Sequence, residues 1–433
     1  MKNKYANQCA TIICIVYQMN KDPINITITT TDHCLPDKKF ILPCSYGLRC
    51  YHGLNCPYWH NKKLKIIPLC KYGQKCTHKG KTCFLSHDII DDKTVVCEYG
   101  LYCYAKDCTK VHPIEANQAV IGKYNLLHRV VQCTAGLNPN LFNITVFDSS
   151  KIPLADLKQV VKIDYLIDVT VDRYTFISNH IYQLFSNKVL GGGSLTHGNV
   201  QEEKMMMNLS ILQYLLYGFH CEKTSPLSNN LQLNPIVIDT MVVVKDNSYS
   251  GCKSNMDSPH YGQNGLKIAH DKTIADSIYD PIDMPLPVKA MAVAVPPFKN
   301  WSGKCYNNSV IMNVFQSLYK AFVTSIAANE SNKSAPECQI HIGNIGCGVF
   351  GHNYHTIFVL QYLAAGCAIN LINPGKKICI KYHAYDEKTY NNLLHVAVPA
   401  LIEWSSLNKP IEIILADLRQ KQISMPDTWA KKL

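Results

Sequence analysis

The stretch GGGSLTHGNVQEEKMMMN, from Gly191 to Asn208, joins a glycine triplet to an acidic helix start. Glycine lets the backbone approach a ligand closely, and a helix N-terminus offers N–H groups to an anion. Seven residues after the triplet, Gln201, Glu202 and Glu203 open an apolar run. The pattern predicts a phosphate-binding loop beside a carboxylic acid. Taken alone, each half has a simpler interpretation, as a glycine-rich surface loop or as an acidic helix start stabilised by the macrodipole.

The spacing GGG-x7-QEE is similar to the signature of the poly(ADP-ribose) glycohydrolases, which are built on a macrodomain and hydrolyse ribose–ribose bonds. The resemblance implies that Asn187, four residues before the triplet, holds the ribose at the scissile bond. It implies a catalytic pair in which Glu203 is the proton donor and Glu202 supports it, while Gln201 holds the loop or the ribose. The predicted loop contacts are Gly191, Gly192 and Gly193.

A second segment, GNIGCGVFGHNYHTIFVLQYLAAGCA from Gly343 to Ala368, resembles the family loop whose backbone N–H groups bind the diphosphate. The family usually has a further glycine where this chain has His352, which could crowd the phosphate or donate a hydrogen bond to it. The predicted contacts in this loop are Asn344, Gly346, Gly348, Val349 and Phe350.

Two aromatic contacts follow from the same resemblance. The SYSG segment places Tyr249 where the family has the tyrosine that stacks on adenine. A late strand of the family carries a phenylalanine over the ribose, and KYHAYDE offers Tyr382 or Tyr385 without deciding between them. The resemblance extends over about Glu115 to Leu433.

The acid pair itself constrains the chemistry. Neighbouring positions on a helix point in different directions, so Glu202 and Glu203 cannot both face one bond. A proton donor must be protonated near neutral pH, and burial beside an anion raises the pKa of a carboxyl group. The alternative function is a non-catalytic reader that binds ADP-ribose and RNA without hydrolysis; such a reader does not need the acid.

Strand-like and helix-like segments alternate through the second half of the chain, which predicts an α/β fold: a macrodomain-like mixed sheet flanked by helices. The Ser/Asn/Asp/Pro-rich stretch 253–287 is predicted to be an excursion from this fold, and INITITTT near the N-terminus could add a strand or two. Strands are expected at 141–148, 160–172, 180–187, 235–244, 288–295, 338–344 and 377–385, and helices at 201–216, 309–328, 353–365 and 387–404.

Three tandem segments share one Cys3His pattern, with a period of 26 or 27 residues. Three thiolates and one imidazole suit tetrahedral zinc, and segments this short need the metal to fold. A disulfide framework is the alternative, but three thiols per unit do not pair. Domain boundaries follow: an N-terminal extension at 1–40, three CCCH fingers at 41–113 and the glycohydrolase-like domain at 114–433. The predicted ligands of three structural Zn²⁺ ions are Cys44, Cys50, Cys56 and His60; Cys70, Cys76, Cys83 and His87; and Cys97, Cys103, Cys108 and His112.

The first two fingers are strongly basic. From Lys38 to His87 there are ten Lys or Arg residues and no Asp or Glu, with aromatic residues among the cysteines. Cations beside stacking rings suit single-stranded nucleic acid, although some rings could simply cover the zinc. The spacing is similar to the zinc fingers of poly(adenosine)-binding RNA-export proteins, which favours RNA. The third finger, with five acidic residues and three lysines from Asp88 to His112, is expected to bind phosphate less well.

Composition fits a folded protein in a reducing compartment. Apolar residues make up 47% of the chain, enough for a sizeable core. The longest apolar stretches are short or interrupted by polar residues, so no membrane span is expected. Because zinc-binding thiolates need reducing conditions, we expect the protein in the nucleus or cytoplasm. No cofactor is expected for catalysis.

Overall fold

The computed structural model of the 433-residue chain describes residues 14–17, 26–33, 144–192, 194, 200–209, 212, 230–246, 279–298, 308–330, 337–348, 350–372, 374 and 376–420. The predicted fingers, Gly193, Tyr249 and Val349 lie outside these residues. The predicted domain boundaries and the metal ligands therefore stay predictions.

Nine strands form one mixed sheet in the order β1-β2-β3-β6-β7-β5-β8-β9-β4. Neighbours from β1 through β7 pair antiparallel, and neighbours from β7 through β4 pair parallel. This confirms the predicted mixed α/β sheet. The strands are β1 (Cys14–Tyr17), β2 (Ile26–His33), β3 (Ile144–Asp148), β4 (Ile167–Thr170), β5 (Ile181–Phe185), β6 (Ile236–Asp246), β7 (Tyr279–Val293), β8 (Glu337–Gly343) and β9 (Lys377–His383).

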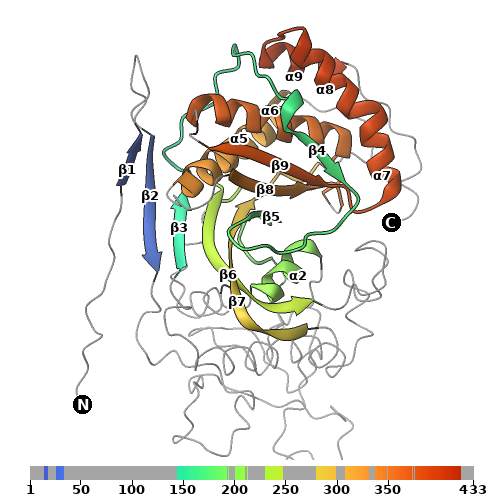
Figure 1. Ribbon diagram of the computed structural model, residues 1–433. Coiled ribbons are helices and arrows are strands. Elements are labelled where there is room, and N and C mark those ends of the chain that lie inside the picture. Colours follow the sequence, from blue (N-terminus) through green and yellow to red (C-terminus); the bar gives the residue numbers. More distant parts are fainter. Residues whose placement is uncertain are drawn as a thin grey trace, which may run out of the picture.

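The N-terminal strands belong to this same sheet. β2 pairs antiparallel with β3, and their register runs from Thr29 opposite Asp148 to His33 opposite Ile144. β1 then pairs outside β2. Figure 1 shows these strands side by side at one edge of the fold. The β-branched INITITTT run thus supplies a strand, as predicted.

Helices cover both faces of the sheet. The long helices α5 and α6 pack on one face in the larger core cluster, and α2 packs on the other face with side chains of β5, β6 and β7. Figure 1 shows α2 on the opposite side of the central strands from α5 and α6. The helices are η6 (Asp164–Leu166), α2 (Gln201–Asn208), α5 (Asn308–Glu330), α6 (Tyr354–Ile372), α7 (Glu387–Asn392), the π-helical η9 (Leu393–Ala397), α8 (Val398–Ser406) and α9 (Ile411–Gln420).

The helices α5 and α6 are long and apolar enough to cross a membrane by length and composition alone. Most of their side chains are buried, where they pack against each other and against the sheet. That environment is what the core helices of an α/β fold require. Their apolar character is therefore explained by the core.

Most predicted elements are confirmed, and four are corrected. The predicted helix at 201–216 is interrupted early, because α2 ends at Asn208 with Leu209 as its C-cap. The predicted strand at 160–172 contains the helical turn η6 and only the short strand β4. The predicted excursion at 253–287 includes the first half of β7, which carries three prolines. Among the described strands this half pairs only with β6, and a strand without a second neighbour tolerates proline. The predicted helix at 387–404 is α7 and α8 joined through η9, and α9 was not predicted.

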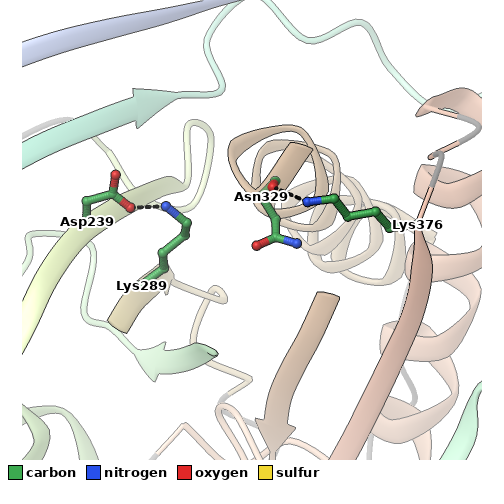
Figure 2. A network of polar contacts seen from close by, with 4 residues as sticks. All are labelled: Asp239, Lys289, Asn329 and Lys376. Carbon is green, nitrogen blue, oxygen red and sulfur yellow. Dashed lines mark hydrogen bonds and ion pairs between the residues drawn. The ribbon is translucent and has the colours of Figure 1, made fainter. Parts of the chain in front are cut away.

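Two lysine ammonium groups at the sheet have oxygen partners. Lys289 of β7 forms an ion pair with Asp239, the residue opposite it in β6 (Figure 2). The Lys376 ammonium donates to the backbone oxygen of Asn329 at 3.2 Å, which fastens the end of α5 to the start of β9. A buried charge is costly unless it is paired, so the ion pair with Asp239 makes buried Lys289 compatible with the core.

Candidate active site

The two glycine-rich loops follow neighbouring parallel strands. β5 leads into the first loop and α2, and β8 leads into the second loop and α6. Because α2 and α6 lie on opposite faces of the sheet, the chain turns to different faces after these two strands. Open α/β sheets bind ligands at such a switch point, beyond the carboxyl ends of the strands. The fold thus brings both predicted loops to one edge.

Gln201 fastens the start of α2 to β5. Its Oε1 accepts from the backbone N–H of Phe185 at 2.9 Å, and its Nε2 donates to the backbone oxygen of Gln183 at 3.1 Å. The side chain is buried, and its amide lies along the last residues of the strand. Gln201 therefore fastens the start of α2 to β5, and its predicted role in holding the loop or the ribose stays a prediction.

Glu202 closes the first loop. Its side chain is only 3% exposed, and its Oε2 accepts from Asn187 N at 3.0 Å while its Oε1 accepts from Gly191 N at 2.8 Å. Burial, followed by the charge of Glu203, raises the pKa of Glu202 to about 8, although the two backbone hydrogen bonds oppose this shift. With both oxygens bound to the loop, Glu202 acts as a support for that loop.

Glu203 lies on the same helical turn, close to Gly192. Its Oε2 accepts from Val200 N at 2.9 Å, which caps the start of α2. A Cβ added to Gly192, whose φ is +45°, would lie 2.6 Å from Glu202 Oε2 and 2.9 Å from Glu203 Oε1. Only a residue without a side chain lets the backbone run this close to both carboxylates. The structure thus brings Glu203 and the glycine loop together, as the sequence predicts.

Asn187 stands at the other end of the loop. Its side chain is exposed, and its Oδ1 accepts from Lys188 N at 2.7 Å. Gly191 has a φ of +95° and is buried, so the chain reverses at the start of the triplet. The exposed Asn187 side chain is accessible to a ligand on the edge where the loop begins.

The second loop is a tight turn built on two glycines with positive φ. Gly346 has a φ of +71°, and a Cβ there would meet Val295 and His352 at 2.4 and 2.8 Å; Gly351 has a φ of +74° and would meet the backbone oxygen of Phe298 at 2.8 Å. Gly348 is exposed, with nothing within 4 Å of an added Cβ. The loop is therefore packed at its ends and open at Gly348, where its backbone is accessible.

His352 is turned away from the exposed part of this loop. It is 2% exposed, its Nε2 donates to the backbone oxygen of Pro296 at 2.6 Å, and burial lowers its pKa to about 4. Phe350 supports the same segment through its backbone oxygen, which accepts from Phe298 N at 2.7 Å. His352 thus holds the chain after β7, a role that the sequence did not indicate.

Both polar atoms of the Asn344 side-chain amide form hydrogen bonds within the protein. Its Nδ2 donates to the backbone oxygen of Ala384 at 3.0 Å, and its Oδ1 accepts from the hydroxyl of Tyr382 at 2.5 Å. Tyr382 is fully buried against Phe358. A ligand would thus meet the backbone of Asn344, and Tyr382 is a core residue.

Tyr385 lies beside the start of the second loop. It is partly buried and has a φ of +67°, which is unusual for a bulky side chain. Its ring, together with that of Phe185, packs where a side chain of Gly343 would lie, at 2.9 and 3.0 Å from an added Cβ. Of the two tyrosines left open by the sequence, Tyr385 lies beside Gly343 at the start of the second loop, whereas Tyr382 is buried in the core. Phe185 was missed, although its position at the end of β5, two residues before Asn187, could have indicated it.

Metal binding is not indicated among the described parts of the chain, which contain no group of three or more His, Cys, Asp or Glu side chains able to hold an ion. The predicted zinc ligands lie outside those parts.

No family model matches the sequence, and no curated protein matches it. Three similar solved structures are poly(ADP-ribose) glycohydrolases. That from Thermomonospora curvata bound to the inhibitor ADP-HPD is 13% identical, with 65% of this chain and 97% of that chain covered and a TM-score of 0.35. A second structure of the enzyme from Thermomonospora curvata is 13% identical, with 66% of this chain and 97% of that chain covered and a TM-score of 0.35. The enzyme from Deinococcus radiodurans in complex with ADP-ribose is 13% identical, with 53% and 77% covered and a TM-score of 0.30. At TM-scores below 0.5 these likenesses carry no argument about the activity of this chain.

Proposed function

We propose that this chain hydrolyses the ribose–ribose O-glycosidic bonds of poly(ADP-ribose), releasing ADP-ribose. The observation that carries the proposal is the double hydrogen bond from Asn187 and Gly191 to Glu202, which folds the glycine loop onto the start of α2. It joins in space the residues that the sequence resemblance marks as ribose, phosphate and acid groups.

In the proposed reaction, Glu203 donates a proton to the oxygen of the departing ribose as the C–O bond breaks. The carboxylate that results then takes a proton from the water that adds to the oxocarbenium-like carbon. Both oxygens of Glu202 accept hydrogen bonds from the loop, so the proposal assigns the proton transfer to Glu203.

Binding of the substrate is assigned to the two loops. Asn187 would hold the ribose, and the backbone around Gly192 and Gly348 would bind phosphate oxygens through N–H groups. Tyr385 would cover the ribose. Tyr249, as the adenine contact, rests on the sequence resemblance alone.

Glu203→Gln tests the function directly. The substitution preserves shape but removes the proton donor, so we expect release of ADP-ribose from labelled polymer to fall about 10²- to 10⁴-fold. Affinity for ADP-ribose, measured by calorimetry, should stay within a few-fold of the parent. If the parent binds ADP-ribose but never hydrolyses the polymer, the protein is a non-catalytic reader.

The N-terminal part of the proposal rests on sequence. Three CCCH fingers would each hold one structural Zn²⁺ and together bind single-stranded RNA, which would bring the hydrolase to ribonucleoproteins in the nucleus or cytoplasm.

Oligo(A) titrations at several salt concentrations test the proposed RNA binding. Reversing the charges of Lys62, Lys63 and Lys65 should flatten the salt dependence, whereas Tyr58→Ala should weaken binding by about 1–3 kcal/mol with little change in slope. Equal affinities for the parent and the lysine variants would remove RNA from the proposal.

A further inference from the structure

Three histidines form a continuous row across the parallel strands. His180 precedes β5, His341 lies in β8 and His383 is the last residue of β9. His180 Nδ1 is 2.9 Å from His341 Nε2, and His341 Nδ1 is 2.9 Å from His383 Nε2. The row ends where His383 Nδ1 lies 2.8 Å from the backbone oxygen of Asp172. The proposed reaction uses none of these side chains.

The end of the row fixes the direction of every hydrogen bond in it. A carbonyl oxygen can only accept, so His383 carries its proton on Nδ1 and, as a neutral ring, accepts through Nε2. His341 must then donate from Nδ1 and accept through Nε2, and His180 must donate from Nδ1. All three rings are therefore in the Nδ1–H form. A proton added to either inner ring would place a charge in this buried row and would reverse the hydrogen bonds on its His180 side.

The surroundings keep the inner rings neutral. Burial lowers the pKa of His341 to about 3, and the other two histidines and Lys381 act in the same direction. Burial lowers the pKa of His383 to about 4; Lys381 adds to this shift, while Asp172 opposes it. His180, at the open end, has a pKa lowered by burial and partly restored by Glu337. The other titratable groups that face the row are the hydroxyls of Tyr174, Tyr182 and Tyr385.

Tyr174 packs against both the last histidine of the row and Tyr385. The Tyr174 ring meets His383 edge-on at 4.8 Å between centroids and lies 5.7 Å from the Tyr385 ring. The bond from His383 to Asp172 holds the chain two residues before Tyr174. Loss of the row would release this segment and remove the packing that supports Tyr385.

We propose that His180, His341 and His383 are positioning residues: their one-directional hydrogen-bond chain holds Tyr174, and through it Tyr385, in place for ADP-ribose. This inference rests on the proposed function for its ligand. It makes ligand affinity depend on neutral imidazoles that never touch the ligand. Affinity should consequently be constant near neutral pH and weaken once the inner rings are protonated in acid.

Paired substitutions at His383 test the role. His383→Phe keeps an aromatic ring beside Tyr174 but removes both hydrogen bonds, and we expect the Kd for ADP-ribose to rise about tenfold at pH 7.5, a loss of about 1.4 kcal/mol. His383→Asn can still donate to Asp172 O and should recover part of this loss. His395→Gln, an exposed histidine of η9, serves as the control and should bind as the parent does. Unchanged affinity in His383→Phe would overturn the inference.

A second measurement examines the row without any ligand. Nitrogen NMR of ¹⁵N-histidine-labelled full chain should show two buried rings in the Nδ1–H form at pH 7, and His341→Phe should remove one of these signals and shift the other. His341 or His383 found in the Nε2–H form would overturn the hydrogen-bond direction on which the inference depends, whereas buried His352, whose Nε2 donates to Pro296 O, should give an Nε2–H signal. If instead the parent binds no ADP-ribose while the Nδ1–H signals are present, the proposed function fails and the row stands as a structural element only.

Discussion

The backbone N–H of Asn187 donates to Glu202 Oε2 at 3.0 Å, although the two residues are 15 positions apart in the sequence. The other oxygen of the same carboxylate accepts from Gly191. One buried side chain therefore joins both ends of the loop that carries the predicted ribose contact. The shape of the loop depends on this carboxylate, and changes in its charge or position should reach the ligand.

Gly192→Ala should impair catalysis. The added methyl group would lie 2.6 Å from Glu202 Oε2 and 2.9 Å from Glu203 Oε1, at a φ of +45°. Displacing the acid by even about 1 Å can cost about 10²-fold in rate, which a polymer hydrolysis assay would measure. The control is Gly366→Ala in α6, where the methyl group would meet Ile163 at 2.6 Å inside the core. It should lower the melting temperature but leave kcat near the parental value. A parental rate for Gly192→Ala would contradict the placement of the loop.

Glu202→Gln should change how stability varies with pH. The pKa of Glu202 is raised to about 8 in the folded protein from a usual value of 4.5. The folded state thus binds this proton more tightly than the unfolded state, and the free energy of unfolding falls as pH rises towards 8. The effect is about 1.4 kcal/mol per pH unit at most. Urea unfolding at pH 6.5 and 8 should show a flatter slope in Glu202→Gln, whereas Glu412→Gln, on the exposed side of α9, should keep the parental slope.

The inner histidines should make the protein sensitive to acid. Their pKa values are lowered in the folded protein, to about 3 for His341 and about 4 for His383, from 6.5. Stability from neutral rings is complete above pH 6.5 and is lost as pH falls, because the unfolded chain takes up protons first. At pH 5 the loss is about 2 kcal/mol for each ring. Urea unfolding at pH 7 and 5 should show a smaller acid loss in His341→Phe than in the parent or in His395→Gln.

Removing the Tyr385 ring should weaken ADP-ribose binding, and the choice of Gly or Ala in its place should decide stability. Its φ of +67° is unfavourable for any residue with a Cβ, so Tyr385→Gly relieves strain that Tyr385→Ala retains. Both variants lose the ring, and we expect both to bind ADP-ribose about tenfold more weakly. The Gly variant should unfold at a higher temperature than the Ala variant. Tyr385→Phe should bind like the parent; equal binding by all three variants would exclude the ring as a ligand contact.

Zinc removal should separate the two activities. Elemental analysis of reduced protein should find three zinc ions per chain, as the three CCCH segments predict. Chelation should abolish RNA binding because such small units fold only with their metal. Polymer hydrolysis should continue, since the proposed hydrolase domain has a core of its own. A zinc content near zero would disprove the finger assignment.

The sequence predicted best those elements whose pattern is local. Short β-branched runs marked β5, β6, β8 and β9, and long apolar runs marked α5 and α6. The first half of β7 was missed because its three prolines read as loop, and only the absence of a second neighbour makes them acceptable there. In 160–172, η6 could not be told from a strand because a short apolar run has no clear period.

The site was predictable where it follows a motif, and unpredictable where it depends on contacts between distant segments. GGG-x7-QEE indicated the loop and both acids, but not that Glu202 binds the loop while Glu203 lies against Gly192. The choice between Tyr382 and Tyr385 needed the pleat of β9, which buries the first. Nothing in the sequence joins His180, His341 and His383, because their row exists only once three parallel strands are placed side by side.

The pairing of His33 with Ile144 has a consequence for the predicted fingers. β2 ends at His33 and β3 begins at Ile144, at facing positions of the sheet, so the predicted finger segment between them would be attached to the sheet at both of its ends. A single proteolytic cut within it would leave both pieces bound to the enzyme. Because both of its ends are attached, the segment could extend from the sheet by no more than half its own length. RNA bound by the proposed fingers would therefore stay near this edge of the sheet.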